Sequence, residues 1–286
     1  MGLEVEVVGE TNKFDVIVIG GGIAGMTASS LVTQAGLKAC FLEKDVPGGK
    51  LMHIDKINDF AAQPGVSGNA LGLSIFKQAT EEVKTNYVYG DVQSIRPKNG
   101  LFYLFTADGQ TWEAKAIIIA VGTGIKKLNI DGEEKYFNHG LSYCVLCDAA
   151  MAKGKDVALV GSTLHLDHLK QFAKKVDVYQ PKDIKSIEGN GSSVTGITKA
   201  DGSKAAYDFV FVENGFEPNA GFLPNDIQLD DNQQIIVDAK MTSPYFEGVF
   251  ACGDCINSTT KKIQPAMEQA AIAADSAIKY IQSKSW

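Results

Sequence analysis

A glycine-rich segment at residues 20–25 restricts the fold more than any other part of this sequence. It follows residues 14–20, a β-branched run typical of a buried parallel strand, and precedes a helical pattern over 26–36. The next apolar run, 38–42, ends at Glu43, eighteen residues past the last glycine of the segment. A strand, a GxGxxG turn, a helix and an acid at the end of the next strand form the dinucleotide-binding fingerprint. The sequence therefore predicts an α/β domain of the Rossmann type.

The three fingerprint glycines have separate physical tasks. Gly20 allows the tight turn, Gly22 lets the backbone approach a pyrophosphate, and Gly25 lets the helix and the strand pack closely. Amides at the helix N-terminus would bind the phosphates. Glu43 would accept hydrogen bonds from a ribose hydroxyl and repel a 2′-phosphate. The segment is predicted to bind FAD or NAD rather than NADP, and a glycine turn without a ligand is the alternative.

Two later segments indicate which dinucleotide is bound. Residues 114–124 form a second buried strand that ends in a turn, and residues 248–254 form a third, followed by a helical pattern over 266–281. In these segments the chain resembles the two-dinucleotide flavoprotein disulfide reductases, whose FAD domain they close. The resemblance implies FAD as the cofactor and an α/β fold with two Rossmann-like three-layer domains.

The same resemblance implies a division of the chain. We expect a discontinuous FAD-binding domain formed by residues 1–121 and 248–286. Residues 122–247 would form an inserted domain that resembles a shortened pyridine-nucleotide domain. Within it, residues 214–219 match the family's return to the flavin domain.

The resemblance also implies a set of cofactor contacts. Asp254 would lie on the ribityl chain, and residues 263–265 would lie near the flavin ring. Lys50 departs from the family, which more often has glutamine at this position. The expected cofactor-binding residues are Gly20, Gly22, Ile23, Ala24, Gly25, Glu43, Lys44, Gly49, Lys50, Leu51, Asn58, Gly122, Gly253, Asp254, Ile263, Gln264 and Pro265.

The most specific short motif is a pair of cysteines at i and i+3, Cys144 and Cys147, followed by Asp148. Such thiols can form a readily reduced disulfide, and a neighbouring carboxyl group can move the proton that thiolate chemistry requires. The motif resembles the redox centre of the low-molecular-weight thioredoxin reductases. By that resemblance Cys147 is the sulfur nearer the flavin, Cys144 attacks the disulfide of thioredoxin, and Asp148 is the acid/base. The reverse assignment of the two sulfurs stays open.

Cys252 and Cys255 repeat the spacing of the first pair. We interpret them as small buried residues, with an auxiliary dithiol near the flavin as the alternative. The two pairs together have the number of thiols that a structural zinc site needs, but zinc at 252 and 255 would displace the cofactor. We therefore expect no metal site, and we assign Cys40 to the core.

A second nucleotide fingerprint is expected in the inserted domain but is degraded. The strand 156–160 leads into Gly161, which keeps only the first of the three small positions. Thr163 stands where a glycine would let the backbone meet the pyrophosphate, and its branched Cβ obstructs that approach. Leu166 stands where a small residue would let the helix and the strand pack closely.

The chain also lacks the means to bind a 2′-phosphate there. Residues 180–182 are Gln-Pro-Lys, where the NADPH-dependent relatives have a His-Arg-Arg cluster. Of 27 basic residues only Arg96 is an arginine, and it lies in the expected FAD domain. The inserted domain is also shortened after Lys182. These three losses predict that NADPH is not the reductant.

Carriers of single electrons are the natural replacement, because a flavin accepts electrons one or two at a time. The chain resembles the ferredoxin-dependent flavin thioredoxin reductases, which keep the dithiol and lack the nucleotide motifs. Electrons would pass from reduced ferredoxin through FAD and the Cys144–Cys147 dithiol to thioredoxin. The family resemblance further implies a homodimer.

Three alternatives remain from this reasoning. Another donor, such as flavodoxin or an unrecognised carrier, would support the same chemistry. NADPH would be the donor if it bound in an unrecognised way. A non-catalytic flavodisulfide redox sensor would keep the same motifs without sustained turnover.

Net charge and the length of the apolar runs limit the partners and the location that we expect for this protein. A net charge of −7 without a basic cluster gives no electrostatic footprint for nucleic acid. The longest apolar run, 116–121, is far shorter than the roughly 20 residues of a membrane helix. We expect a cytoplasmic protein that binds neither nucleic acid nor membrane.

Overall fold

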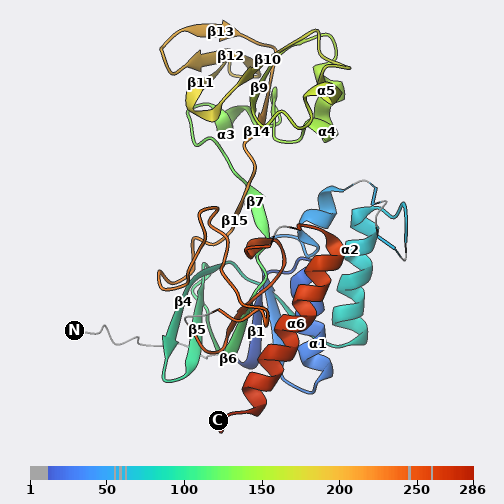
Figure 1. Ribbon diagram of the computed structural model, residues 1–286, viewed down its shortest axis with the longest axis vertical. Coiled ribbons are helices and arrows are strands. Elements are labelled where there is room, and N and C mark those ends of the chain that lie inside the picture. The colour runs from blue at the N-terminus through green and yellow to red at the C-terminus, as the bar shows by residue number, and fades with distance from the viewer. Residues whose placement is uncertain (1–11, 55, 58–59, 62, 244–245, 259) are drawn as a thin grey trace, which may run out of the picture. The chain divides into compact units, whose positions relative to one another are not determined.

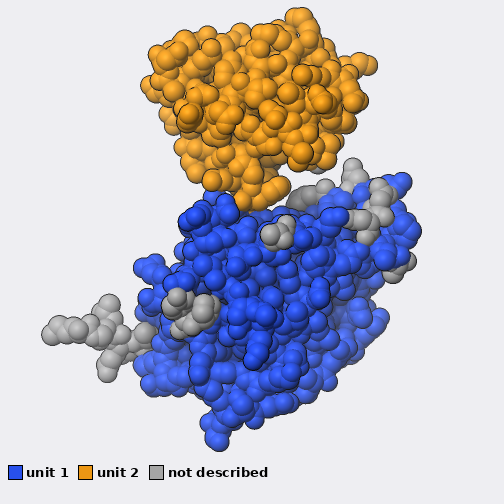
Figure 2. Space-filling view, in the orientation of Figure 1, with its two compact units in different colours: residues 1–123, 217–286 blue, residues 124–216 orange. Residues whose placement is uncertain are grey.

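The computed structural model describes residues 12–54, 56–57, 60–61, 63–243, 246–258 and 260–286, apart from the side chains of His53 and Cys147. The chain divides into two compact units (Figure 2). Unit 1 runs to Thr123 and resumes at Glu217–Trp286, and unit 2 is Gly124–Phe216. In the described part of the chain, no helix combines the length and the apolar character needed to cross a membrane.

The described residues of unit 1 form one seven-stranded sheet in the order β3-β2-β1-β6-β5-β4, with β16 also paired to β6. Strands β1, β2, β3 and β16 join the sheet in parallel, whereas β4 and β5 are antiparallel. The strands are β1 (Asn12–Ile19), β2 (Ala39–Glu43), β3 (Asn86–Tyr89), β4 (Val92–Lys98), β5 (Leu101–Thr106), β6 (Thr111–Ile119) and β16 (Val249–Ala251).

Central strand β1 explains the arrangement of layers. Its last four residues are apolar and at most 4% exposed, as expected for a parallel strand that is covered on both faces. Val16 and Val18 pack on the side of α1 (Ile23–Gln34) and α6 (Ile263–Gln282), while Ile17 and Ile19 pack on the opposite side. Figure 1 shows α1 and α6 beside each other against the sheet. The helix α2 (Gly68–Lys77) completes this unit.

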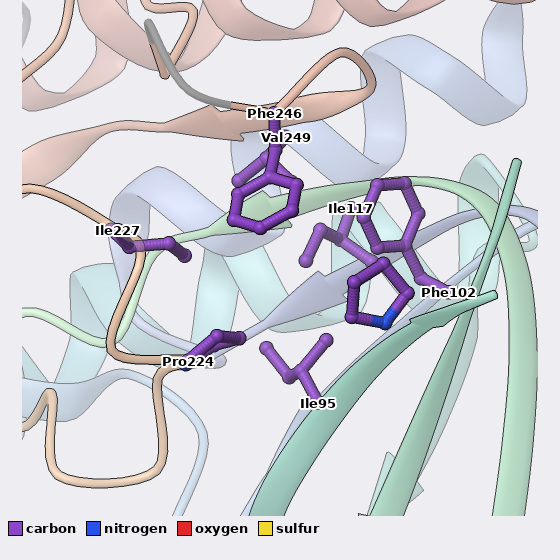
Figure 3. A pocket seen from close by; sticks show the side chains of 8 residues that line it. Ile95, Phe102, Ile117, Pro224, Ile227, Phe246 and Val249 are labelled. Carbon is purple, nitrogen blue, oxygen red and sulfur yellow. The ribbon is translucent and has the colours of Figure 1, made fainter. Parts of the chain in front are cut away.

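The far face of the sheet is covered by residues 217–243 and 246–247, which were expected to belong to the inserted domain. Ile227 and Ile235 are buried in the same apolar cluster as Ile17 and Ile19 of β1. Figure 3 shows Ile227 with Pro224 and Phe246 beside the side chains of the sheet. The predicted domain boundary at residue 247 is therefore wrong, because this segment buries its apolar side chains in unit 1. The first boundary, at residue 122, differs from the observed one by two residues.

Unit 2 has three layers. A parallel sheet in the order β10-β9-β14-β8 carries one apolar cluster on each face. The helical segments α4 and α5 cover one face, and an antiparallel sheet of β11, β12 and β13 covers the other. The parallel strands are β8 (Leu141–Ser142), β9 (Asp156–Gly161), β10 (Lys175–Tyr179) and β14 (Phe209–Glu213). The other elements are α3 (Glu133–Tyr136), α4 (Val145–Asp148), α5 (Leu166–Leu169), β11 (Ile184–Gly189), β12 (Val194–Lys199) and β13 (Lys204–Ala206).

Two short strands, β7 (Thr123–Ile125) and β15 (Phe216–Pro218), pair with each other where the chain passes between the units. The prediction of an α/β protein with Rossmann-like domains is confirmed, since unit 1 contains a mixed sheet and unit 2 a parallel sheet, each covered on both faces.

Candidate functional site

The turn after β1 has the backbone geometry that the first fingerprint requires. Gly20 has a φ of +108°, and a Cβ there would lie 2.4 Å from the carbonyl oxygen of Ala120. A Cβ on Gly25 would lie 1.9 Å from the carbonyl oxygen of Gly20. Neither position therefore has room for a side chain.

Gly22 differs from the other two glycines, because a Cβ there would meet no atom within 4 Å. It is the N-cap residue of α1, and among the described residues no side chain caps this helix end. The backbone amides of the first turn, starting with those of Ile23 and Ala24, have no partners within the helix. An open backbone at a helix N-terminus is suited to bind phosphate.

The carboxylate of Glu43 lies beside this turn at the end of β2. Its Oε2 accepts a hydrogen bond from the Gly21 amide at 2.6 Å, and its Oε1 accepts one from the Asp45 amide at 2.8 Å. Each carboxylate oxygen has a further lone pair, so ribose hydroxyls can still donate to it. The neighbouring Lys44 is exposed.

A second glycine turn packs on the fingerprint. The Gly48 amide donates to the carbonyl oxygen of Gly21 at 2.8 Å, and a Cβ on Gly49 would lie 3.3 Å from the Gly22 Cα. Gly49 begins a short 3₁₀ helix, in which the Leu51 side chain is buried. The structure thus brings Gly49 against the first fingerprint, although 23 residues lie between Gly25 and Gly49 in the chain.

Lys50 makes a cluster that the sequence did not reveal. Its Nζ lies 2.8 Å from Asp254 Oδ2 and 2.5 Å from Thr123 Oγ1. Asp254 lies in the short turn that follows β16. The first residue of this turn, Gly253, has a φ of +79°. A lysine can form this ion pair, whereas the glutamine more common in the family could only hydrogen-bond. Thr123 follows Gly122, and no motif distinguishes it in the sequence.

The turn after β16 also contacts both flanking helices of unit 1. A Cβ on Gly253 would lie 2.9 Å from the Ala24 Cβ of α1, and the Gly253 amide donates to Gln269 Oε1 of α6 at 3.0 Å. The expected flavin-ring residues Ile263, Gln264 and Pro265 form the first turn of α6. Asn58 lies outside the described residues.

These features fit FAD. The open backbone at Gly22 can receive a pyrophosphate, the Glu43 carboxylate can accept from ribose hydroxyls, and the Asp254 carboxylate can accept from a polyol chain. All three belong to unit 1.

The redox motif lies at the end of β8 in unit 2. Cys144 is disulfide-bonded, and the side chain of Cys147, which belongs to α4, lies outside the described part of the chain. Ser142, which the sequence analysis did not single out, is buried. Its hydroxyl donates to Asp148 Oδ2 at 2.6 Å and accepts from the Cys144 amide at 3.0 Å. Ser142 thus connects the first cysteine to the carboxylate.

The three remaining cysteines are free thiols. Burial raises the pKa of the Cys255 thiol to about 11 and also raises the pKa of Cys252 and of Cys40. The Cys255 thiol faces the Cys252 carbonyl oxygen at 3.3 Å. These protonated, buried thiols favour the interpretation of Cys252 and Cys255 as small packing residues. Among the described side chains, no group of three or more His, Cys, Asp or Glu residues could hold a metal ion.

The degraded fingerprint of unit 2 keeps the turn and loses the helix. Gly161 at the end of β9 has a φ of +107°, close to that of Gly20. Thr163 and Leu166 follow, but α5 has only four residues. Gln180 is the N-cap of a short 3₁₀ helix. Arg96 is far from this site in sequence and lies in β4 of unit 1, where its guanidinium carbon is 5.3 Å from the centroid of the Phe105 ring.

A comparison with protein families matches the pyridine nucleotide-disulphide oxidoreductase family over residues 14–164 and 167–277. The thioredoxin reductase of Listeria monocytogenes is 29% identical over 307 residues, covering 96% of this chain and 95% of its own. The thioredoxin reductase of Bacillus subtilis is 27% identical over 308 residues, which cover 96% of this chain and 96% of its own.

Two solved structures extend this result. Lactococcus lactis thioredoxin reductase has 26% identity and a TM-score of 0.79, covering 95% of this chain and 100% of its own. A ferredoxin-flavin thioredoxin reductase from Clostridium acetobutylicum has 26% identity and a TM-score of 0.60, covering 96% of this chain and 99% of its own. Equal identity to both leaves the electron donor undecided. FAD is the cofactor of this family. The chain belongs to the pyridine nucleotide-disulphide oxidoreductase family, as a flavoprotein disulfide oxidoreductase of the thioredoxin reductase type.

Proposed function

We propose that this protein is a ferredoxin-dependent thioredoxin reductase that does not use pyridine nucleotides. One observation carries the proposal: unit 2 keeps the redox motif but not the features that bind a dinucleotide. Gly161 keeps its turn, whereas Thr163 and Leu166 replace the small residues and α5 is a single turn. The branched side chain of Thr163 and the large side chain of Leu166 obstruct the approach of a pyrophosphate to this turn.

The reaction balances with two one-electron donors. Two reduced ferredoxins and two protons convert one thioredoxin disulfide into a dithiol and leave two oxidised ferredoxins. Bound FAD supplies a store that accepts electrons singly and releases them as a pair. The residues proposed to hold FAD are the fingerprint glycines, Glu43, the Gly49 turn, Asp254 and the first turn of α6.

The chain's own thiols exchange with the substrate. In the reduced dithiol, Cys144 attacks the thioredoxin disulfide and forms a mixed disulfide, which Cys147 then resolves. Asp148 transfers the proton that accompanies these steps, and Ser142 holds one of its carboxylate oxygens. The roles of the two sulfurs follow the family resemblance and are part of the proposal.

Assembly and location are also proposed. We propose a homodimer, which sedimentation of the holoprotein would test. We also propose a cytoplasmic location, supported by three free buried thiols, since reducing compartments keep cysteines in this form.

An anaerobic mixing experiment tests the donor. The oxidised holoprotein is mixed with NADPH, NADH or reduced ferredoxin, and the flavin absorbance is followed. We expect bleaching by ferredoxin alone and catalytic reduction of thioredoxin in its presence. Rapid bleaching by NADPH would contradict the proposal. Bleaching by ferredoxin without thioredoxin turnover would indicate a redox sensor instead.

A matched pair of variants tests the dithiol. Ser replacement of Cys144 should leave flavin bleaching by ferredoxin intact and abolish thioredoxin reduction. Ser replacement of Cys40 provides the control, because this thiol is buried in the core of unit 1, belongs to neither cysteine pair and should not affect turnover.

A further inference from the structure

The two units contain the same strand-end geometry, with one difference in the side chains. In unit 1 the end of β1 meets the end of β6, and a Cβ on Gly20 would lie 2.4 Å from the Ala120 carbonyl oxygen. In unit 2 the end of β9 meets the end of β14, and a Cβ on Gly161 would lie 2.4 Å from the Glu213 carbonyl oxygen. Glu213 therefore occupies in unit 2 the position that Ala120 occupies in unit 1.

The small side chain of Ala120 serves the nucleotide site of unit 1. It is 5% exposed, and its Cβ lies 3.4 Å from where a Cβ on Gly25 would be. The first turn of α1 can therefore come close to the sheet. An alanine also adds no charge at the edge where the phosphates are expected.

Glu213 has the opposite properties. Its Oε1 lies 2.5 Å from His165 Nδ1, and His165 directly precedes the single turn of α5. The Glu213 side chain is only 11% exposed. Its Oε2 is buried and has no hydrogen-bond partner among the residues that the structure describes.

The position of this carboxylate is where a dinucleotide would have to bind. The chain goes from β9 to β10 on one side, while β14 lies on the other side of β9, so the β9/β14 edge is the switch point of the sheet. Ligands of such sheets bind outside the carboxyl ends of the strands at that point. A phosphate oxygen and a carboxylate oxygen both only accept hydrogen bonds, and their charges repel.

We propose that Glu213, held by His165, is a specificity-determining residue that excludes pyridine dinucleotides from unit 2. The inference rests on the proposed function, in which no nucleotide reduces the protein. It goes further by assigning the exclusion to a specific acidic side chain rather than to the lost glycines alone. At the switch point, where a complete fingerprint would contact its ligand, this chain has the negatively charged side chain of Glu213.

The test restores the lost small residues first. In the holoprotein, Thr163→Gly/Leu166→Ala is compared with the same double variant carrying Glu213→Gln. The probe is ADP-ribose, which contains the pyrophosphate but transfers no hydride, and its binding is measured by calorimetry. We expect at least a tenfold tighter binding when Gln replaces Glu213, because the amide has the same size, lacks the charge and can donate.

Controls separate charge from size and from misfolding. Glu213→Ala in the same background should also gain binding, and His165→Ala with Glu213 retained should not. Circular dichroism and bound FAD check that each variant is folded, and only folded variants are compared. Equal binding with and without Glu213, or no binding in any folded variant that lacks it, would overturn the inference. Failure of the proposed function would appear separately, as bleaching of the unmodified protein by NADPH.

Discussion

At the scale of single residues, a serine that the cysteine spacing does not reveal connects the parts of the redox motif. Ser142 is fixed by the pairing of β8 with β14, and its hydroxyl contacts both the Cys144 amide and the Asp148 carboxylate. A buried hydroxyl with both contacts satisfied restricts the orientation of the carboxylate. We infer that it keeps Asp148 in place for proton transfer.

Replacement of Ser142 by alanine should slow the reduction of thioredoxin by pre-reduced protein about tenfold, because the carboxylate loses its orienting donor. Threonine at this position keeps the hydroxyl and should restore most of the rate. The double variant Ser142→Ala/Asp148→Asn should be no slower than Asp148→Asn alone, since the serine acts through the acid. Stopped-flow measurement of the half-reaction checks this, and equal losses in the alanine and threonine variants would contradict it.

The free thiols permit a second test at this scale. Because burial raises the pKa of Cys255 to about 11, its thiol stays protonated at pH 8 and should react slowly with Ellman's reagent. In the reduced, folded protein we expect only the motif thiols to react rapidly. Fast labelling of Cys252 or Cys255 would instead support the auxiliary dithiol. Labelling in urea provides the control, since all thiols become accessible there.

At the scale of elements, the strand, the turn and the helix of the first fingerprint form in the order that the pattern predicts, because each depends on residues that are close in the chain. Helix α1 begins three residues before the predicted start and ends two residues before the predicted end, and β1 begins two residues earlier than predicted. In the second fingerprint, the turn at Gly161 also forms directly after a strand. The pattern did not show that its helix would shrink to the four residues of α5.

Two glycine substitutions distinguish folding from cofactor binding. Gly25→Ala places a Cβ 1.9 Å from the Gly20 carbonyl oxygen, so we expect poor folding and little bound FAD. Gly22→Ala meets no atom of the protein, and its φ of −73° suits alanine, so the fold should persist. This variant should lose FAD on dilution about tenfold more readily, since the backbone can no longer approach the pyrophosphate. Circular dichroism and flavin content measure the two effects.

At the scale of the whole molecule, the division into units follows burial rather than motif order. The segment after Phe216 belongs to unit 1, where Ile235 is fully buried and its amide donates to the Cys255 carbonyl oxygen at 2.8 Å. Residues 214–219 match the family's return to the flavin domain, yet the expected inserted domain extended to residue 247, just before the next strand motif. Irregular segments lack the periodicity that would reveal which core they cover.

A pair of core variants tests this division. Ile235→Ala should destabilise unit 1 by about 3 kcal/mol and release FAD at lower urea concentration, because a buried isoleucine leaves a cavity. Ile197→Ala, a fully buried residue of unit 2, should reduce the hydrogen-exchange protection of β9 and β14 without promoting FAD release. The prediction fails if the two variants release FAD alike.

The sequence by itself determined the Rossmann-type fold, the first nucleotide fingerprint, the cysteine motif and the loss of the second fingerprint. Each of these depends on residue types at short, fixed spacings, where backbone sterics and thiol chemistry leave few alternatives. The tertiary structure alone decided the true boundary at Phe216, the Lys50–Asp254 pair, the contact between Ser142 and Asp148, and the position of Glu213 at the strand edge. These depend on packing and strand pairing, which bring together residues that no local pattern connects.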